Sequence, residues 1–302
     1  MSLKNDLNFG INMTNKIEVK LEKELKAEFR KSLKSIKSQI ANAYEKYDVM
    51  TYQEMNKYNR LINLQKELNV QISALSKKTI SLNNKRLGEV YTGSYYSTGY
   101  AMEKGVQAKL SYTMINAKTI KATLQNPISG LTLNERLQNQ RRKVIIRIKS
   151  TITQGLIRGV SYSEMAKSIS ESMDMEYKKA TAIARTEAHR CQIVGRREGL
   201  DHAQEEGVKG SYVWSATLDG LTRDSHGEMD GQKADKDGYF TLPCGAKTLG
   251  PSLSGIAEED INCRCTLVYQ IDGFEPKQRR ARGEGVIPYT NYTDWKESRL
   301  GG

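Results

Sequence analysis

Polar and sulfur-bearing side chains gather near the C-terminal end of this 302-residue chain. Asp219, Arg223, His226 and Asp230 follow a Tyr-Val-Trp segment, and the segment Asn262-Cys263-Arg264-Cys265 lies further on. Carboxylates, imidazoles and thiolates bind transition metals and also act as general acids and bases. These residues are therefore the first candidates for a functional site.

Two of the cysteines are spaced so that they could share one ion. If Cys263 and Cys265 lie on a strand, both side chains point to the same face, about 6–7 Å apart. Together with His226 and Cys244 they would complete a tetrahedral Cys3His set of the kind that Zn²⁺ prefers. The spacing does not match a standard zinc motif, so a pair of packed thiols is the alternative. Zinc is the one cofactor that the sequence suggests.

A second group of charged residues lies in the segment Arg185-Thr186-Glu187-Ala188-His189-Arg190, within a predicted helix. Helical spacing places Arg185 and His189 on one face, and Glu187 and Arg190 on a neighbouring face. Such groups could serve an enzyme as acid, base and anion clamp. The alternative, which we favour, is an ion-paired helix face that docks the small C-terminal module.

The densest basic cluster of the chain lies in a helix predicted over residues 134–159. Its members are Arg141, Arg142, Lys143, Arg147 and Lys149. Lys and Arg side chains contact phosphate oxygens without reading the bases. We therefore predict that this cluster binds double-stranded DNA without sequence preference.

The elements that must position these groups begin with long helices. Residues 4–87 contain no Pro and, after Gly10, no Gly, and they are rich in Lys, Glu and Leu, which favours helix. Two apolar stripes with spacings of three and four predict a helical hairpin or arm over residues 1–90. The stripes are Ile17, Leu21, Leu25, Phe29, Leu33, Ile36 and Ile40, and Met55, Tyr58, Leu61, Leu64, Leu68 and Ile72.

The remainder of the chain is predicted from changes in composition. Tyr, Gly, Ser and Thr over residues 91–133 indicate an irregular or partly helical connector. Residues 134–206 are predicted to be helical, with a short helix capped by Ser161 and Glu164 and a long helix over 176–206.

Residues 207–272 predict a small α+β part with strands at Tyr212–Trp214 and Cys265–Tyr269. The tail, residues 273–302, is rich in Gly and Arg and is predicted to be flexible. The expected fold class is α+β and mainly α, with residues 134–272 as one module.

Composition excludes several classes of protein. The chain is 38% hydrophobic, enough for a core, but no apolar run approaches the roughly 20 residues that a membrane span requires. The first 30 residues lack the apolar centre of a signal peptide. Four cysteines are too few for a disulfide scaffold. We expect no membrane partner and synthesis in the cytoplasm.

The net charge of +12 is unevenly distributed. Residues 1–90 carry 17 Lys and Arg against 10 Asp and Glu, and residues 91–200 carry 18 against 8. Residues 201–302 carry 12 against 17. A basic body of this kind attracts polyanions, so nucleic acid is a plausible partner, and a solvated basic surface is the alternative.

Taken in order, the motifs between Thr151 and Val268 resemble the phage Mu protein F-like family of head-morphogenesis, or minor head, proteins. The residues that carry the resemblance are the turn Gly159–Ser161, the helix segment Ala180–Glu187, Trp214, Asp219, Thr222, Arg223, His226, Asp230, Gly231, Pro243, Pro251 and Asn262–Cys265. The positions that carry over as family signature are Arg185, Thr186, Glu187, Asp219, Arg223, His226, Asp230, Asn262, Cys263 and Cys265.

The resemblance implies a minor structural protein of a tailed-bacteriophage head. Such a protein joins the procapsid at the portal vertex, during assembly in the host cytoplasm, and is associated with DNA packaging, retention or delivery inside the virion. The expected partners are therefore the portal protein, other head or scaffold components and double-stranded DNA. The family carries no established catalysis, so its signature positions imply no catalytic residue.

Two other functional classes remain as alternatives. A metal-dependent hydrolase or nuclease would centre on His226 and the C-terminal cysteines, with Asp219 and Asp230 nearby. An adaptor that binds only protein would need no DNA contact. An ADP-ribosyltransferase is more remote, because no Glu-x-Glu follows a Ser-Thr-Ser strand, and we expect no room for an effector domain in the roughly 34 residues after Val268.

Overall fold

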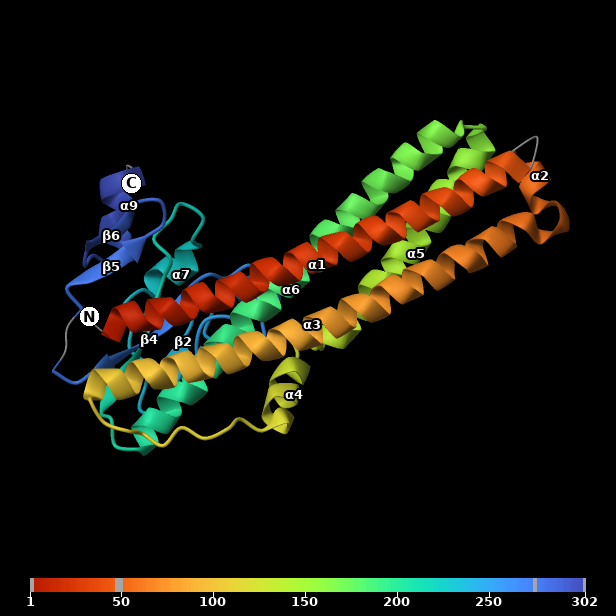
Figure 1. Ribbon diagram of the computed structural model, residues 1–302. Helices are drawn as coiled ribbons and strands as arrows, with labels where there is room; N and C mark the ends of the chain where they lie inside the picture. The colour runs from red at the N-terminus through yellow and green to blue at the C-terminus, as the bar shows by residue number, and fades with distance from the viewer. Residues whose placement is uncertain (1–2, 47–50, 274–275, 301–302) are drawn as a thin grey trace. The chain divides into compact units, whose positions relative to one another are not determined.

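The computed structural model of the protein describes residues 3–46, 51–273 and 276–300. It is mainly helical, with a few short antiparallel strands toward the C-terminus, which confirms the predicted fold class (Figure 1). The chain forms two compact units. We call Glu18–Arg86 with Leu131–Ala184 the helical unit, and Met1–Ile17, Leu87–Gly130 and Arg185–Gly302 the mixed unit.

Four long helices build the helical unit, and three of them continue into the mixed unit. They are α1 (Leu3–Lys46), α3 (Arg60–Val106), α5 (Leu133–Arg158) and α6 (Tyr162–Glu205). The short helices α2 (Tyr52–Asn56) and η1 (Lys57–Asn59) lie between α1 and α3. Figure 1 shows α1 antiparallel to α3, and α5 antiparallel to α6. Short connections favour antiparallel neighbours of this kind.

The predicted apolar stripes form the core of the helical unit. Phe29 and Ile36 from α1, Leu68 from α3 and Val144 from α5 are all buried in one cluster. Apolar residues that recur every three or four positions lie on one face of a helix, which explains why these side chains meet. The hairpin predicted over residues 1–90 is confirmed in its two long helices, while the side chain of Tyr58 lies outside the described part.

Two turn signals connect α5 to α6 as the sequence predicts. Gly159 ends α5 in the left-handed region, with φ 66°. The Glu164 carboxylate accepts a hydrogen bond from the Ser161 N–H at 2.9 Å, and the Glu164 N–H donates to Ser161 Oγ. The predicted division into a short helix and a second one from residue 176 is wrong. With neither Gly nor Pro between residues 161 and 194, α6 continues without a break.

The predicted connector over residues 91–133 is partly helical, because α3 continues to Val106 before the chain becomes irregular. The Gly, Ser and Thr residues of this stretch lie where helices approach closely. A Cβ at Gly195 of α6 would lie 2.4 Å from the carbonyl oxygen of Tyr91. The small residues therefore permit backbone contact between α3 and α6 within the mixed unit, and they do not end the helix. Only α4 (Ala117–Gln125) interrupts the irregular chain that follows.

The C-terminal part of the mixed unit is built on one antiparallel strand pair. Strand β1 (Gly210–Ser215) pairs with β4 (Thr266–Ile271), with Val213 opposite Val268. Both predicted strands are thus confirmed within a residue or two of their ends. The smaller elements are β2 (Phe240–Thr241), β3 (Lys247–Thr248), α7 (Asp224–Glu228) and α8 (Ala257–Asp260).

The tail predicted to be flexible is folded over most of its length. It contains the hairpin β5 (Gln278–Ala281) and β6 (Gly285–Pro288) and the helix α9 (Tyr292–Leu300). Arg279 and Trp295 from these elements are buried. Composition indicates looseness here because the buried partners of the tail lie far away in the sequence. Within the described residues, no helix is long and apolar enough to cross a membrane.

The close contact at Gly195 gives a prediction. Changing Gly195 to Ala places a methyl group against the Tyr91 carbonyl, and we expect a loss of about 1–3 kcal/mol in the free energy of unfolding. Gly88→Ala is the matched control, because its Cβ would lie an ordinary 3.5 Å from Ile120 and alanine favours helix. Thermal denaturation should show a lower midpoint for Gly195→Ala only. Equal midpoints would contradict the close packing.

Candidate functional site

Asp230 and Arg279 form a buried ion pair in the mixed unit. Arg279 Nη1 lies 2.6 Å from Asp230 Oδ2, and Nη2 lies 3.1 Å from Oδ1, so the pairing is bidentate. The Asp230 carboxylate also accepts hydrogen bonds from the backbone N–H groups of Ala216, at 2.8 Å, and Tyr292, at 2.7 Å. Both side chains are almost fully buried. One carboxylate therefore joins the end of β1 to β5 and to the start of α9.

Arg279 uses its remaining donors in the same region. Its Nη2 donates to the Ala216 carbonyl at 2.7 Å, and its Nη1 donates to the Thr290 carbonyl at 2.9 Å. A buried charge is tolerated when its hydrogen-bonding capacity is satisfied in this way. The contacts leave neither group available for a substrate. Asp230 is thus a structural position in this fold.

Asp219 is a second carboxylate held by arginines. Arg264 Nη2 lies 2.9 Å from Asp219 Oδ1 and Arg282 Nη1 lies 3.4 Å from Oδ2, while the Leu221 N–H donates to Oδ1 at 2.9 Å. Burial raises the pKa of Asp219, but the hydrogen bond from Leu221 and the ion pair with Arg264 outweigh it, and the pKa is lowered overall. Asp219 is therefore an ionised anchor for the loop after β1.

His226, Cys263 and Cys265 converge in the interior between α7 and the chain that leads into β4. The Nδ1 atom of His226 lies 3.6 Å from Cys263 Sγ and 3.5 Å from Cys265 Sγ. All three side chains are buried, and one ligand atom from each lies within 4.8 Å of the others. Among the described residues, this is the only group of three or more His, Cys, Asp or Glu with that property.

The acidity of these groups reflects their mutual contact. A hydrogen bond with Cys265 lowers the pKa of the Cys263 thiol well below its usual range, and His189 and His226 add to the effect against burial. Burial lowers the pKa of His226, but contact with Cys263 more than offsets it, and the pKa is raised. The pKa of Cys265 is raised, chiefly because Cys263 takes the thiolate. Cysteine sulfur and histidine nitrogen are the donor atoms that Zn²⁺ prefers in proteins.

The structure does not bring Cys244 to this group, contrary to the predicted metal set. Cys244 is exposed in the turn between β2 and β3. The His189 side chain of α6 interacts with the Cys263 thiol, but it lies outside the group of three whose ligand atoms are within 4.8 Å of one another. The sequence could not exclude Cys244, since its distance from Cys263 is set by the tertiary fold.

The Arg185–Arg190 segment of α6 faces the same region. The Asn262 N–H donates to Thr186 Oγ1 at 3.4 Å, and Asn262 has a φ of 58°, a left-handed conformation that Asn tolerates. Glu187 and Arg190 are buried and lie 3.6 Å apart, as predicted for an ion-paired helix face. Arg185 is exposed. The signature segments at 185–190 and 262–265 therefore meet within one site.

Arg223 also supports this arrangement. Its guanidinium donates to the carbonyl oxygens of Glu259, at 3.5 Å, and of Ile261. The neighbouring Glu259 carboxylate lies 2.9 Å from His226 Nε2. Neither Glu259 nor Arg279 is among the candidates predicted from sequence, and no local pattern singles them out, because their partners lie 33 and 49 residues away.

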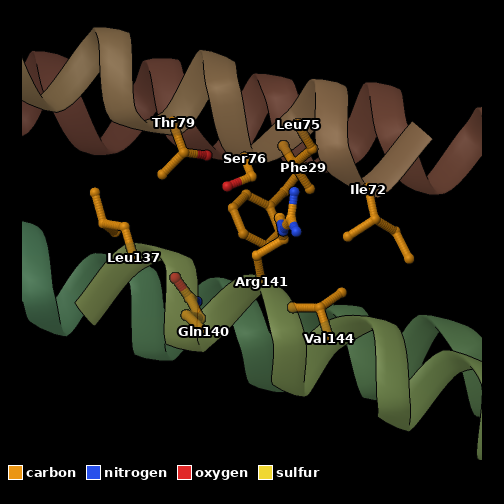
Figure 2. Close-up of a pocket in the computed structure, with 9 residues that line it drawn as sticks. All are labelled: Phe29, Ile72, Leu75, Ser76, Thr79, Leu137, Gln140, Arg141 and Val144. Atoms are coloured by element: carbon orange, nitrogen blue, oxygen red, sulfur yellow. The ribbon is translucent and has the colours of Figure 1, made fainter. Parts of the chain in front are cut away.

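The predicted DNA-binding cluster lies in the helical unit and divides into two parts. Arg141 lines a small pocket of about 20 Å³ with Phe29 and Ile72, and Figure 2 shows its side chain among them. Arg147 lies 3.4 Å from the buried Glu176 carboxylate. Arg142 and Lys143 are exposed, and Lys149 is half-buried. The pocket is about the size of one water molecule, which is too small for a substrate.

The segment that holds most of these residues matches a known protein family. Residues 146–268 match the phage Mu protein F like protein family. The chain is 36% identical over 288 residues to the minor head protein GP7 of Bacillus phage SPP1, covering 92% of each chain. This protein therefore belongs to the phage minor head proteins of the Mu F-like family, and its SPP1 relative supports a structural role in a phage head.

Two further relatives extend the comparison. The chain is 32% identical over 273 residues to the NAD(+)--arginine ADP-ribosyltransferase EFV of Enterococcus faecalis. The aligned region covers 90% of this chain but only 56% of that protein. It is 29% identical over 141 residues to an uncharacterized protein of Haemophilus influenzae, covering 46% of this chain and 28% of that protein. No solved structure is significantly similar to the chain.

The buried ion pair gives a second prediction. Asp230→Asn leaves the Arg279 charge buried without a counterion, and we expect the free energy of unfolding to fall by about 3–5 kcal/mol. Asp224→Asn is the matched control, because the Asp224–Lys296 pair is exposed. Urea denaturation should separate the two variants. A small effect for Asp230→Asn, equal to that of the control, would show that the pair does not hold the C-terminal elements.

Proposed function

We propose that this protein is a minor structural component of a tailed-phage head that enters the procapsid through contact with the portal protein and stays in the virion beside the packaged DNA. The observation that carries the proposal is the 36% identity to the SPP1 minor head protein over nearly the whole of both chains. Assembly in the host cytoplasm fits this role. The other head or scaffold components are further partners under this proposal.

The distribution of charge supports the DNA part of the proposal. The first 200 residues carry 35 Lys and Arg against 18 Asp and Glu. Arg142 and Lys143 are exposed on consecutive positions of α5. Phosphate contacts by such side chains are independent of base sequence and weaken steeply with salt. Non-specific attachment of this kind suits a protein that lies against densely packed DNA.

The site geometry favours a structural role over catalysis. Asp219 and Asp230 are engaged by arginines, and His226, Cys263 and Cys265 are buried, so a substrate has no direct access to these groups. A metal-dependent hydrolase is therefore less well supported. The transferase activity in the name of the Enterococcus relative belongs to a protein of which this chain spans a little over half, and we propose no such activity here.

Contact with the portal protein can be measured directly. Co-expressed with the portal protein encoded in the same genome, the full chain should co-purify with it after nuclease treatment and at high salt, since a protein interface does not depend on DNA. A protein of similar size and positive charge serves as the control. Loss of the complex after nuclease treatment would show that DNA alone had joined the two proteins.

DNA binding gives a separate prediction. Replacing Arg142 and Lys143 by Gln should weaken binding to duplex DNA. The slope of log K against log salt concentration should become shallower, by an amount equivalent to up to about two phosphate contacts. The control is the double change of Lys233 and Lys236 to Gln, which removes the same charge from exposed positions in the acidic part of the chain. Binding would be followed by fluorescence anisotropy at several salt concentrations. An unchanged slope for Arg142 and Lys143 would exclude this surface.

A further inference from the structure

We propose that His189, His226, Cys263 and Cys265 bind one Zn²⁺ ion in a closed tetrahedral site that fastens α6 to α7 and to the chain before β4. The four residues all belong to the mixed unit. A site with four protein ligands leaves no position for a substrate, so the ion has a structural role. The proposal does not depend on contact with portal protein or DNA.

The distances around His226 fit a shared ion. Zn–S bonds of about 2.3 Å and Zn–N bonds of about 2.0–2.1 Å, at tetrahedral angles, place nitrogen and sulfur about 3.6 Å apart. The observed separations from Nδ1 are 3.6 Å to Cys263 and 3.5 Å to Cys265. One imidazole nitrogen has a single lone pair or a single proton, so it makes one good hydrogen bond. Two sulfurs at equal distance from it are better explained by a common cation.

Glu259 prepares His226 for this role. Its Oε2 lies 2.9 Å from His226 Nε2, on the side of the ring opposite the sulfurs. A proton on Nε2 then donates to the carboxylate, which leaves the Nδ1 lone pair directed toward Cys263 and Cys265. Carboxylate–histidine–zinc arrangements of this kind orient the ring and increase its basicity. Glu259 is thus a positioning residue and not a ligand.

His189 is the fourth ligand in this proposal. Its side chain interacts with the Cys263 thiol, and its Nε2 atom is buried without a hydrogen-bond partner among the described residues. It lies outside the group of three whose ligand atoms are within 4.8 Å of one another, so the side chain must move closer to that group to bind the ion. A buried polar atom with no partner is costly, and coordination of an ion would satisfy it. His189 also lies one helical turn after Arg185 and close to Thr186, which contacts Asn262. This position on α6 places its ring toward the Cys263–Cys265 segment.

Other uses of these groups are less consistent with the geometry. Cys263, His226 and Glu259 resemble the order of a nucleophile, a base and an orienting carboxylate. However, Cys263 is only 4% exposed, and a second thiol is equally close to the base. Reactive cysteines are at least partly accessible. A metal accounts for both thiols, both histidines and the burial.

The test is to measure zinc in the full-length protein, expressed with added Zn²⁺ and desalted without chelator. We expect about one Zn²⁺ per chain by elemental mass spectrometry. Competition with a zinc-binding dye should show a loss of affinity of more than 100-fold for His189→Ala and Cys263→Ser, and of about 10–100-fold for Glu259→Gln. Cys244→Ser and Glu258→Gln, both at exposed positions, are the matched controls and should bind as the wild type.

X-ray absorption at the zinc edge of the wild-type protein tests the ligand set without any variant that might fail to fold. Two sulfur and two nitrogen neighbours would support the proposal. No bound zinc, three sulfur neighbours, or an oxygen in place of the second nitrogen would overturn it. Wild-type affinity in His189→Ala would overturn the assignment of that ligand. Rapid alkylation of Cys263 in a zinc-free wild-type protein would identify a nucleophile instead.

Discussion

The bidentate ion pair between Asp230 and Arg279 is the interaction on which the C-terminal elements depend. It lies among the ends of β1, β5 and α9, and its two buried charges are satisfied by each other and by four backbone groups. These elements contribute Ala281, Tyr292 and Trp295 to the apolar core, and the ion pair joins them to the end of β1. The ion pair favours a single arrangement of these elements. A displacement of either partner would leave a buried charge unpaired, which costs free energy.

The residues predicted as the family signature hold segments of the mixed unit together. Asp219 is fixed by Arg264, Asn262 adopts a left-handed turn against Thr186, and the two cysteines that flank Arg264 face His226. Three distant segments meet here, because each supplies one side of a hydrogen bond or ion pair. They are α6, the loop after β1 and the chain before β4. The polar residues of this small core are thus held by partners that lie far away in the sequence.

Local periodicity allowed the sequence to predict the long helices and the β1–β4 pair, since spacing of three to four or of two is independent of distant contacts. The same reasoning failed where tertiary contact determined the outcome. The small residues of α3 are typical of a connector, yet together with Gly195 they allow two helices to touch. Arg279 lies in a stretch whose composition indicates a loose tail, because its partner is 49 residues away. Cys244 could not be excluded from the predicted metal set, because only the fold places it in an exposed turn.

Hydrogen–deuterium exchange of wild-type protein and an Arg279→Gln variant, followed by mass spectrometry, tests most directly whether this ion pair organises the C-terminal part. We expect faster exchange in peptides covering β5, β6, α9 and the Asp230 turn, with unchanged protection in α5. Protection that is retained in β5, β6 and α9 would show that apolar packing alone fixes these elements. That result would contradict the central role of the buried pair.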